Sequence, residues 1–306
     1  MSGTRALVVG YGSIGARHAR VLSELGCSTA VVSRRSVDHP NVYSDVAAAL
    51  SAQRTDYVVI ANATNQHYDT LAQLAELGYE GKVLVEKPLF DRVRPLPEHA
   101  FSFVGVAYNL RFHPVIRRLK TLVESQQALS VQAYVGQYLP DWRPGADYRT
   151  SYSANAERGG GALRDLSHEL DYLLWLFGSW EAATALGGHF SPLEISSDDV
   201  YSLLVRTRRC PVLSVQLNYL DRRVRRCLIV NTVEHTFEAD LVQGTVAIDR
   251  TCESFVTDRD CTYRAMHQAV LGDRGETVCS LCGALDALRL IEAAEAATGG
   301  RQWIQA

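Results

Sequence analysis

The stretch Ala6–Gly15, with the sequence ALVVGYGSIG, decides the fold of this chain. Residues 6–9 form an apolar run of strand length. Gly10, Gly12 and Gly15 follow it as G-x-G-x-x-G, and a helical pattern of apolar residues comes next. This order of strand, glycine turn and helix is the context in which the pattern binds a dinucleotide. We therefore expect a parallel α/β sheet with a dinucleotide site at the end of its first strand.

Each glycine of the turn has a separate expected role. Gly10 permits the tight turn, Gly12 lets the backbone approach a pyrophosphate, and Gly15 lets the helix pack close to the strand. The helix start at Ser13 and Ile14 offers free N–H groups and a partial positive charge to the phosphates. All five residues are predicted to bind the cofactor.

The end of the second expected strand, over residues 28–33, predicts which cofactor is used. A residue that reads the ribose belongs there, and an NAD-preferring site places Asp or Glu at this point. This chain has Ser33, Arg34 and Arg35 instead. Two guanidinium groups could pair with a 2′-phosphate, so the sequence favours NADP over NAD. The alternative is that both arginines are solvated loop residues and that either cofactor is used.

Two further loops follow apolar strands predicted over residues 57–61 and 83–85. Loops after parallel strands line the ligand crevice of an open α/β sheet. Lys87 precedes a proline, which favours an extended backbone directed away from the sheet. The predicted cofactor contacts in these loops are Asn62, Thr64, Asn65, His67, Glu86 and Lys87.

Composition sets the class of protein. The 306 residues are 47% hydrophobic and 21% charged, which suits one large or two medium globular domains. The net charge of −3 gives no sign of a nucleic-acid partner. The first apolar run is a core strand, not a signal peptide, and we expect no membrane segment. Seven scattered cysteines suit reduced thiols in the cytoplasm. We interpret Cys279 and Cys282 as packing residues and expect no metal site.

A candidate catalytic helix is predicted over residues 162–177, directly after Gly159–Gly161. Asp165 and His168 lie off its apolar stripe, and the three glycines would allow a ligand to approach the helix start closely. Histidine can move a hydroxyl proton near neutral pH. Lys87 can donate a hydrogen bond to the same oxygen. We therefore expect Lys87 and His168 to act on one carbinol or carbonyl carbon, while Asp165 orients His168 or binds a neighbouring substrate hydroxyl.

The loop over residues 139–149, LPDWRPGADYR, is dense in aromatic and cationic groups. Such a loop can stack on sugar rings and bind anions, although a structural crossing loop is an equal alternative. The predicted substrate contacts in it are Trp142, Arg143, Tyr148 and Arg149.

Taken together, these motifs resemble the glucose–fructose oxidoreductase / inositol dehydrogenase (Gfo/Idh/MocA) family. The resemblance rests on GYGSIGARH at 10–18, VVIANATNQH at 58–67, VEKPL at 85–89, YNLRFHP at 108–114 and GGGALRDLSHELDYLLWLFG at 159–178. It implies a Rossmann domain over residues 1–107 and a second α/β domain over residues 108–306. The second domain would hold a large, mainly antiparallel open sheet, often used in oligomer contacts.

The resemblance also implies roles for particular residues. It assigns catalysis to Lys87, Asp165 and His168, and it places Asn109 and Arg111 of the crossover motif on the substrate side. The chain departs from the family in two places. Many relatives have D-x-x-x-H, whereas Asp165 and His168 are three apart. The downstream H-x-x-D, from His168 to Asp171, is retained, so the base role is assigned to His168. Residues 91–97 are rich in proline and predict a loop where the family has a helix.

The expected function is oxidation or reduction with NAD(P) at a hydroxyl or carbonyl carbon of a sugar, cyclitol or nucleotide sugar. The aromatic and arginine-rich loop favours a charged or nucleotide-linked sugar. One alternative is a glycosidase-type enzyme that oxidises its substrate transiently, and another is a cofactor-binding regulator without catalysis. We expect a homo-oligomer, either a dimer or a tetramer.

Overall fold

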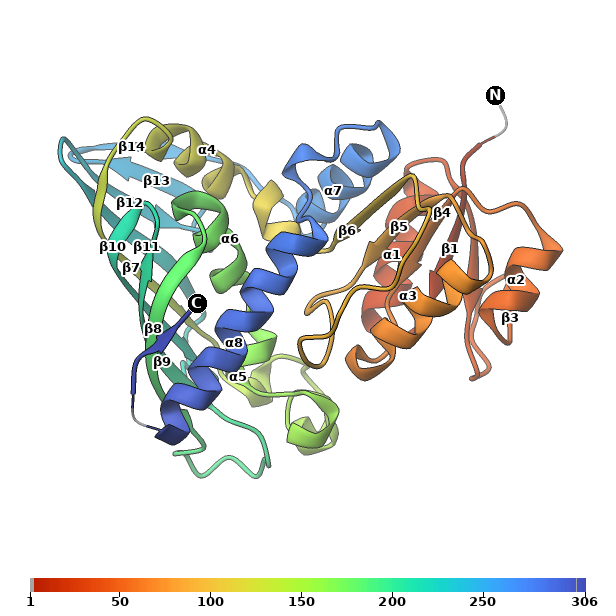
Figure 1. Ribbon diagram of the computed structural model, residues 1–306, viewed down its shortest axis with the longest axis horizontal. Coiled ribbons are helices and arrows are strands. Elements are labelled where there is room, and N and C mark those ends of the chain that lie inside the picture. The colour runs from red at the N-terminus through yellow and green to blue at the C-terminus, as the bar shows by residue number, and fades with distance from the viewer. Residues whose placement is uncertain (1–2, 301) are drawn as a thin grey trace. The chain divides into compact units, whose positions relative to one another are not determined.

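The structure is a computed structural model that describes residues 3–300 and 302–306. The chain forms two compact units, whose elements are labelled in Figure 1. The first comprises Met1–Phe112 and Arg259–Ala284, and the second comprises His113–Asp258 and Leu285–Ala306. The first unit therefore extends beyond the boundary expected at residue 107 and includes a segment from near the end of the chain.

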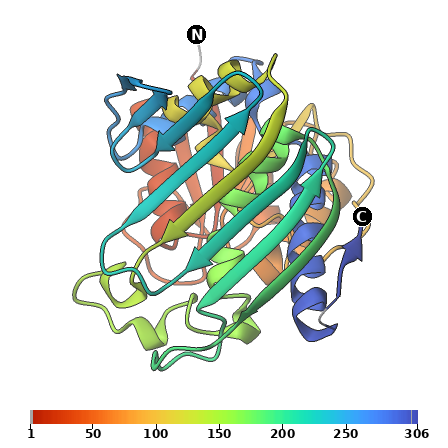
Figure 2. The same cartoon turned by 90° about the vertical axis from the view of Figure 1, so that its left-hand side faces the viewer.

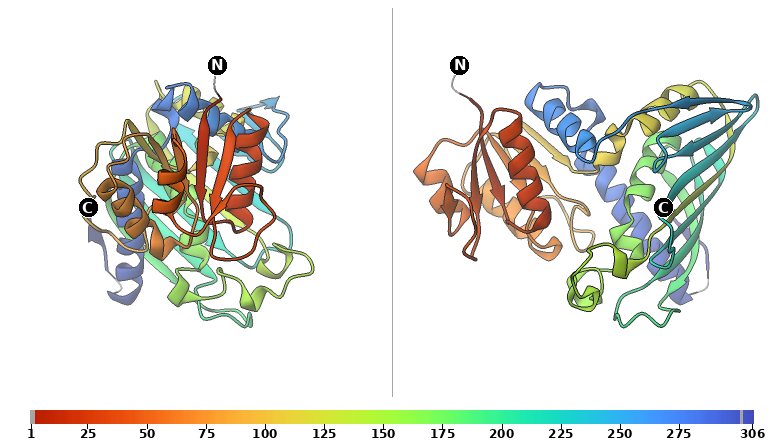
Figure 3. Two further views of the ribbon diagram at one scale, coloured as in Figure 1. Left: turned by 90° about the vertical axis from the view of Figure 1, so that its right-hand side faces the viewer. Right: turned by 180° about the vertical axis from the view of Figure 1, so that it is seen from behind.

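The first unit contains a six-stranded parallel sheet in the order β3-β2-β1-β4-β5-β6. Its strands are apolar because helices cover both faces. The strands are β1 (Arg5–Val9), β2 (Ser28–Val32), β3 (Val42–Tyr43), β4 (Tyr57–Ile60), β5 (Lys82–Val85) and β6 (Phe103–Val106). The sheet and its helices are also seen in Figure 3.

Helix α7 (Cys261–Leu271) belongs to this unit because it completes the core. Its Met266 and Val270 share one buried cluster with Leu22 of helix α1 (Ser13–Glu24) and with alternate residues of the strands. Helices α2 (Val46–Ala52) and α3 (His67–Glu76) pack on β2 and β4. The proline-rich segment between β5 and β6 contains no helix, as its composition predicts.

The second unit is built on a nine-stranded sheet in the order β14-β13-β12-β11-β7-β10-β9-β8-β15. Its pairs are antiparallel except for β7 with β10. Figure 2 shows the open face of this sheet. The strands are β7 (Ala128–Gly136), β8 (Trp180–Gly188), β9 (Val200–Thr207), β10 (Cys210–Asn218), β11 (Arg225–Thr232), β12 (Thr236–Asp240), β13 (Thr245–Ile248), β14 (Thr251–Ser254) and β15 (Ile304–Gln305).

Helices α4 (Pro114–Val123), α5 (Ala162–Asp165) and α6 (His168–Phe177) pack against β12, β10 and β7. Helix α8 (Leu281–Gly300) begins in the first unit and continues in the second. Short 3-10 helices are η1 (Thr64–Gln66), η2 (Asn109–Phe112), η3 (Leu139–Asp141), η4 (Tyr148–Thr150), η5 (Ala156–Arg158) and η6 (Gly275–Thr277). Within residues 3–300 and 302–306, no helix has both the length and the apolar composition needed to span a membrane.

The helix predicted over residues 162–177 is wrong as a single element. It is broken between α5 and α6, because Leu166 leaves helical geometry at φ −94° and ψ 20°. The Ser167 N–H bonds back to the carbonyl of Arg164 instead of continuing the ladder. Asp165 therefore ends one helix and His168 begins the next. The expected helical spacing of these two residues does not apply.

Candidate active site

The glycine turn between β1 and α1 matches its expected geometry. A Cβ on Gly10, whose φ is +96°, would lie 2.5 Å from the backbone nitrogen of Asn62, and one on Gly15 would lie 1.9 Å from the Gly10 carbonyl oxygen. The chain itself therefore requires these two glycines. A Cβ on Gly12 would meet nothing within 4 Å. The G-x-G-x-x-G pattern predicts that the pyrophosphate binds at this open side of the turn.

The N-terminus of α1 is free to receive an anion. Gly12 is its N-cap and supplies no side-chain acceptor, and the first turn of α1 contains no acidic residue. The first N–H groups of a helix have no partner within the helix, so those of Ser13 and Ile14 depend on water or a ligand. The donor set and the open turn fit a dinucleotide pyrophosphate.

The turn after β2 presents two arginines. The Ser33 hydroxyl donates to the carbonyl of Arg35 at 3.0 Å and accepts from its N–H at 3.1 Å, which fixes the turn locally. Arg34 and Arg35 are exposed, and among the described residues no carboxylate pairs with either guanidinium. Their positive charge is therefore not offset by the protein.

The loop after β4 contains an unsatisfied acceptor. Asn62 donates through Nδ2 to Thr70 Oγ1 at 2.8 Å, while its buried Oδ1 has no partner among the described residues. Thr64 is buried at the start of η1, and the neighbouring Asn65 is exposed. The free Asn62 oxygen fits a ligand hydroxyl at this edge of the sheet.

His67 joins two loops of the sheet edge. Its side chain is buried, with Nδ1 3.1 Å from the carbonyl oxygen of Pro88 and Nε2 3.2 Å from that of Asn62. Burial lowers its pKa, so the ring is neutral near pH 7. These contacts give His67 a role in holding the loops, and its direct contact with a cofactor stays a prediction.

Glu86 and Lys87 follow β5 at the same edge. The Lys87 N–H donates to Glu86 Oε2 at 3.0 Å, and Glu86 Oε1 lies 2.8 Å from His18 Nε2. Burial alone would raise the pKa of Glu86, but the hydrogen bond from His18 and the charge of Lys87 bring it below its ordinary value. Glu86 is therefore an ionised, buried carboxylate beside the predicted catalytic lysine.

Asn109 and Arg111, predicted for the substrate side, are buried in η2. Asn109 donates to Thr262 Oγ1 at 2.6 Å, and Arg111 donates through Nη2 to Cys279 Sγ at 3.2 Å. Both side chains thus bind the late segment of the first unit, because η2 packs on α7. Their contact with a substrate stays a prediction.

In the second unit, Asp165 forms a hydrogen bond that the sequence did not predict. The Tyr219 hydroxyl donates to Asp165 Oδ2 at 2.7 Å. Burial, reinforced by the Asp165 charge, raises the pKa of Tyr219 well above its ordinary value, so this hydroxyl keeps its proton. Trp142 packs edge-on against the Tyr219 ring with centroids 5.1 Å apart. One predicted substrate residue is thereby connected to the Asp165 carboxylate.

At Gly160 and Gly161, before α5, the space that a side chain would enter is occupied by the protein itself, where the sequence predicts close approach of a ligand. A Cβ on Gly160 would lie 2.2 Å from the Tyr152 carbonyl oxygen, and one on Gly161 would lie 2.1 Å from Asp198 Oδ1. The protein's own chain fills the space. Asp198 also accepts a hydrogen bond from the Leu163 N–H at 2.9 Å. Burial raises the pKa of Asp198 to about 6.

His168 is half-buried as the first residue of α6. The following Glu169 is fully buried and forms an ion pair with Arg226, with Nε and Oε1 2.8 Å apart. Tyr172 donates to the same carboxylate at 3.1 Å. Burial raises the pKa of Glu169, although Arg226 opposes this effect. This ion pair connects α6 to β11 of the sheet.

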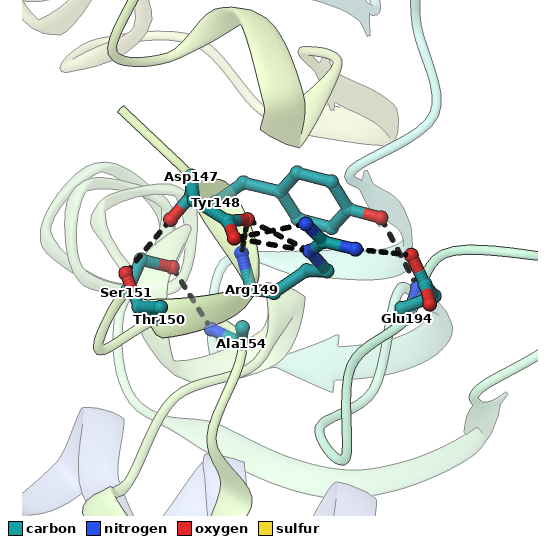
Figure 4. A network of polar contacts seen from close by, with 7 residues as sticks. All are labelled: Asp147, Tyr148, Arg149, Thr150, Ser151, Ala154 and Glu194. Atoms are coloured by element: carbon teal, nitrogen blue, oxygen red, sulfur yellow. Dashed lines mark hydrogen bonds and ion pairs between the residues drawn. The ribbon is translucent and has the colours of Figure 1, made fainter. Parts of the chain in front are cut away.

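The aromatic and arginine-rich loop is bound to itself and to Glu194, as Figure 4 shows. Arg149 pairs with Asp147 at 2.9 Å and with Glu194 at 3.0 Å. The Tyr148 hydroxyl accepts a hydrogen bond from the Glu194 N–H at 3.2 Å. Two carboxylates offset the Arg149 charge, so the structural alternative suits Arg149 and Tyr148. Arg143 is exposed.

Lys87 lies in the first unit, and Asp165 and His168 lie in the second, so their common site stays a prediction. Within residues 3–300 and 302–306, no cluster of His, Cys, Asp and Glu is arranged to hold a metal ion. Sequence reasoning missed two polar partners of the predicted residues: His18, which binds Glu86, and Tyr219, which binds Asp165. Neither lies in a local pattern that reveals its partner, because the members of each pair are far apart along the chain.

Comparison with known families gives matches over both units. The sequence profile of the oxidoreductase family with an NAD-binding Rossmann fold, GFO_IDH_MocA, matches residues 4–101. The GFO/IDH/MocA C-terminal domain profile matches residues 116–235. No curated protein sequence gives a significant match.

Solved structures share the fold across the whole chain. GenD2 from gentamicin A biosynthesis, solved with NAD, is 22% identical with a TM-score of 0.82, over 100% of this chain and 97% of that one. An oxidoreductase from Thermotoga maritima is 19% identical with a TM-score of 0.82, over 99% and 98% of the two chains. Levoglucosan dehydrogenase, solved with NADH and L-sorbose, is 15% identical with a TM-score of 0.83, also over 99% and 98%.

The two profiles together match well over half of the chain, in the order that the two units require. The sequence motifs and the parallel and antiparallel sheets agree with them. The chain belongs to the Gfo/Idh/MocA family of NAD-binding oxidoreductases.

Proposed function

We propose that this protein is a dehydrogenase or reductase that acts on a hydroxyl or carbonyl carbon of a sugar, cyclitol or nucleotide sugar. The observation that carries the proposal is the edge of the parallel sheet, where the open glycine turn follows β1 and Lys87 follows β5, with only β4 between these two strands. Levoglucosan dehydrogenase, which shares the fold, was solved with the sugar L-sorbose, and this supports a sugar-type substrate.

The nicotinamide, when bound, supplies or accepts the hydride. In the proposed mechanism, Lys87 donates a hydrogen bond to the reacting oxygen of the substrate and stabilises negative charge there. His168 moves the hydroxyl proton at its ring nitrogen. Asp165, held by the Tyr219 hydroxyl, binds a neighbouring substrate hydroxyl.

We assign the preferred cofactor as NADP. Arg34 and Arg35 are exposed at the end of β2, where the ribose of a bound dinucleotide is read, and the described protein gives them no carboxylate partner. A 2′-phosphate would supply the missing negative charge. With NAD bound, both guanidinium groups would stay in water at little energetic cost. We therefore expect NAD to bind as well, with lower affinity than NADP.

The aromatic and arginine-rich loop over residues 139–149 favours a charged or nucleotide-linked sugar as the substrate. Arg143 is exposed on the loop, and Trp142 next to it contacts the Tyr219 ring that holds Asp165. An aromatic face beside a carboxylate suits a sugar ring, and an exposed guanidinium suits a phosphate.

The open face of the nine-stranded sheet supports assembly into a homo-oligomer, a dimer or a tetramer. Leu204, Val212 and Ile229 on adjacent or nearby strands are exposed there, at 46%, 53% and 39%. Exposed apolar side chains gathered on one face are typical of an interface. The cytoplasmic location predicted from the cysteines stays a prediction.

The decisive experiment is a screen of sugars, cyclitols and nucleotide sugars against NADP and NAD, with cofactor absorbance and product identity measured together. Oxidation or reduction of one class, lost in Lys87→Ala, supports the proposal. Hydrolysis of a glycoside without net change in the cofactor indicates the transient-oxidation alternative. Cofactor binding with no turnover of any class contradicts a catalytic role and favours a regulator.

A further inference from the structure

A chain of hydrogen-bonded side chains crosses the otherwise apolar core of the first unit. His18 Nε2 lies 2.8 Å from Glu86 Oε1, and His18 Nδ1 lies 2.8 Å from His267 Nε2. His267 Nδ1 lies 3.0 Å from the Tyr57 hydroxyl. The side chains of His18, His267 and Tyr57 have no exposed surface. Such groups are costly in an apolar core unless every one is hydrogen-bonded.

The two ends of this chain lie at opposite edges of the parallel sheet. Glu86 follows β5 at the edge where ligands bind, and its second oxygen accepts the N–H of Lys87. Tyr57 is the first residue of β4, which pairs in parallel with β5. Helices α1 and α7 contribute the two histidines between them.

The protonation states of His267, Tyr57 and Glu86 follow from their surroundings. Burial lowers the pKa of His267 well below its ordinary value and raises that of Tyr57, so His267 is neutral and Tyr57 keeps its proton. Burial also opposes ionisation of Glu86, but His18 and Lys87 bring its pKa below the ordinary value. Ionised Glu86 can only accept, so His18 donates through Nε2.

The two remaining hydrogen bonds, Tyr57–His267 and His267–His18, then have one favourable direction from donor to acceptor. A neutral imidazole carries one N–H. If Tyr57 donates to His267 Nδ1, the N–H on His267 Nε2 donates to His18 Nδ1, and each member is satisfied. If His267 Nδ1 instead donated to the Tyr57 oxygen, the Tyr57 hydroxyl hydrogen would have no acceptor. Among the described residues, His267 is the hydrogen-bond partner of that hydroxyl. The chain therefore runs from the Tyr57 donor to the Glu86 acceptor.

We propose that Glu86 is a positioning residue for Lys87, and that the chain of Tyr57, His267 and His18 holds its carboxylate in the position that binds the Lys87 N–H. This proposal rests on the proposed catalytic role of Lys87. Its physical basis is that donors in fixed positions hold the Glu86 carboxylate in one orientation. The Lys87 N–H, which binds this carboxylate, is then held in one position as well. Loss of the distant Tyr57 hydroxyl would remove the donor that fixes the direction of the chain.

The lysine content of the protein allows a direct spectroscopic test without a substrate. Lys82, Lys87 and Lys120 are the only lysines in the sequence, so a [15N]lysine-labelled sample gives three backbone amide signals. Lys82→Arg and Lys120→Arg variants assign them. We expect Glu86→Gln to shift the Lys87 signal, because a neutral amide oxygen is a weaker acceptor than a carboxylate. We also expect Tyr57→Phe to shift it through the chain.

Tyr79→Phe is the matched control for Tyr57→Phe. The Tyr79 hydroxyl belongs to the same unit but donates to the Lys82 carbonyl at 3.2 Å, outside the chain. It should leave the Lys87 signal in place. In turnover assays, Glu86→Gln and Tyr57→Phe should lower kcat by about 10-fold or more through misplacement of Lys87. KM and dinucleotide affinity should stay near wild type, and Tyr79→Phe should have no effect on kcat.

The proposal is overturned if the Lys87 amide signal of folded Glu86→Gln matches wild type, or if Tyr57→Phe behaves like Tyr79→Phe in both measurements. A wild-type protein with no dehydrogenase activity would reject the proposed function instead. The amide signals would still decide whether the chain controls the backbone at Lys87.

Discussion

Tyr219 donates its hydroxyl hydrogen to Asp165 Oδ2 across 2.7 Å, joining the end of β10 to the end of α5. Because burial keeps Tyr219 protonated, the carboxylate of Asp165 has a permanent donor on one oxygen. In the proposed mechanism this carboxylate binds a substrate hydroxyl. The role of Asp165 thus depends on a partner that lies far away in the sequence.

Tyr219→Phe should lower kcat/KM by about 10-fold, the effect of losing a hydrogen bond of ~1.5 kcal/mol to a charged group. Tyr134→Phe is the matched control, since the Tyr134 hydroxyl donates to Asp221 at 2.9 Å on the same sheet without contacting Asp165. Steady-state kinetics of both variants provide the measurement. Equal losses in the two variants would show that only general stability of the sheet is affected.

Gly12→Val should abolish dinucleotide binding and leave the fold intact. The added side chain enters space that is open in the protein, and the φ of −81° suits any residue. Gly15→Val should instead destabilise the first unit, because its Cβ would lie 1.9 Å from the Gly10 carbonyl oxygen. Dinucleotide titration and thermal unfolding of both variants separate the two effects. Normal cofactor affinity in folded Gly12→Val would contradict the proposed site.

The double variant Arg34→Ala/Arg35→Ala should bind NADP about 10-fold or more weakly, with little change for NAD, because only the 2′-phosphate pairs with the guanidinium groups. Arg54→Ala is the control, because Arg54 is also exposed to solvent but pairs with Asp56 at the other end of the sheet. The ratio of the two dissociation constants is the quantity to measure. A wild-type preference for NAD would overturn the assignment.

Lys87→Ala and His168→Ala should each reduce turnover by ~10²–10⁴-fold while cofactor affinity and folding persist. The two losses should combine to less than their product, since both groups act on one proton transfer. Lys120→Ala, in the second unit with its amine over the Trp175 ring, is the control for removal of a lysine. Fully multiplicative losses would show that Lys87 and His168 act in separate steps.

Asp198 should make the second unit less stable as the pH rises. Its pKa is about 6 in the folded protein, against an ordinary value of 3.8, so the folded state holds the proton that the unfolded state has released. The stabilisation from the neutral Asp198 carboxyl is fully present when the pH is below its ordinary pKa of 3.8, and it is lost as the pH rises through about 6. Asp198→Asn removes this titration but keeps an acceptor for the Leu163 N–H.

The Asn variant should therefore gain about 2–3 kcal/mol relative to wild type at neutral pH, and the gain should shrink toward pH ~4. Denaturant unfolding at several pH values measures the difference. A gain that does not vary with pH would show that Asp198 is not the titrating group.

The first strand, glycine turn and helix of the first unit were predictable because their signals are local. The glycine spacing at residues 10–15 and the apolar runs around it predict strand, turn and helix within one short segment. Parallel strands then place Lys87 and the loop at Asn62 at one edge by topology alone. The break in the candidate catalytic helix was not predictable in this way, since the apolar stripe continues across Leu166 where the backbone leaves the helix.

What only the tertiary structure decided is the partner of each polar group. Gly160 and Gly161 serve the protein's own chain, Arg149 is neutralised by Glu194, and Tyr219 holds Asp165. Helix α7 brings His267 to His18 across most of the sequence. Periodicity and turn chemistry act between near neighbours, whereas hydrogen bonds in a core depend on distance in space, and only the folded chain fixes that distance.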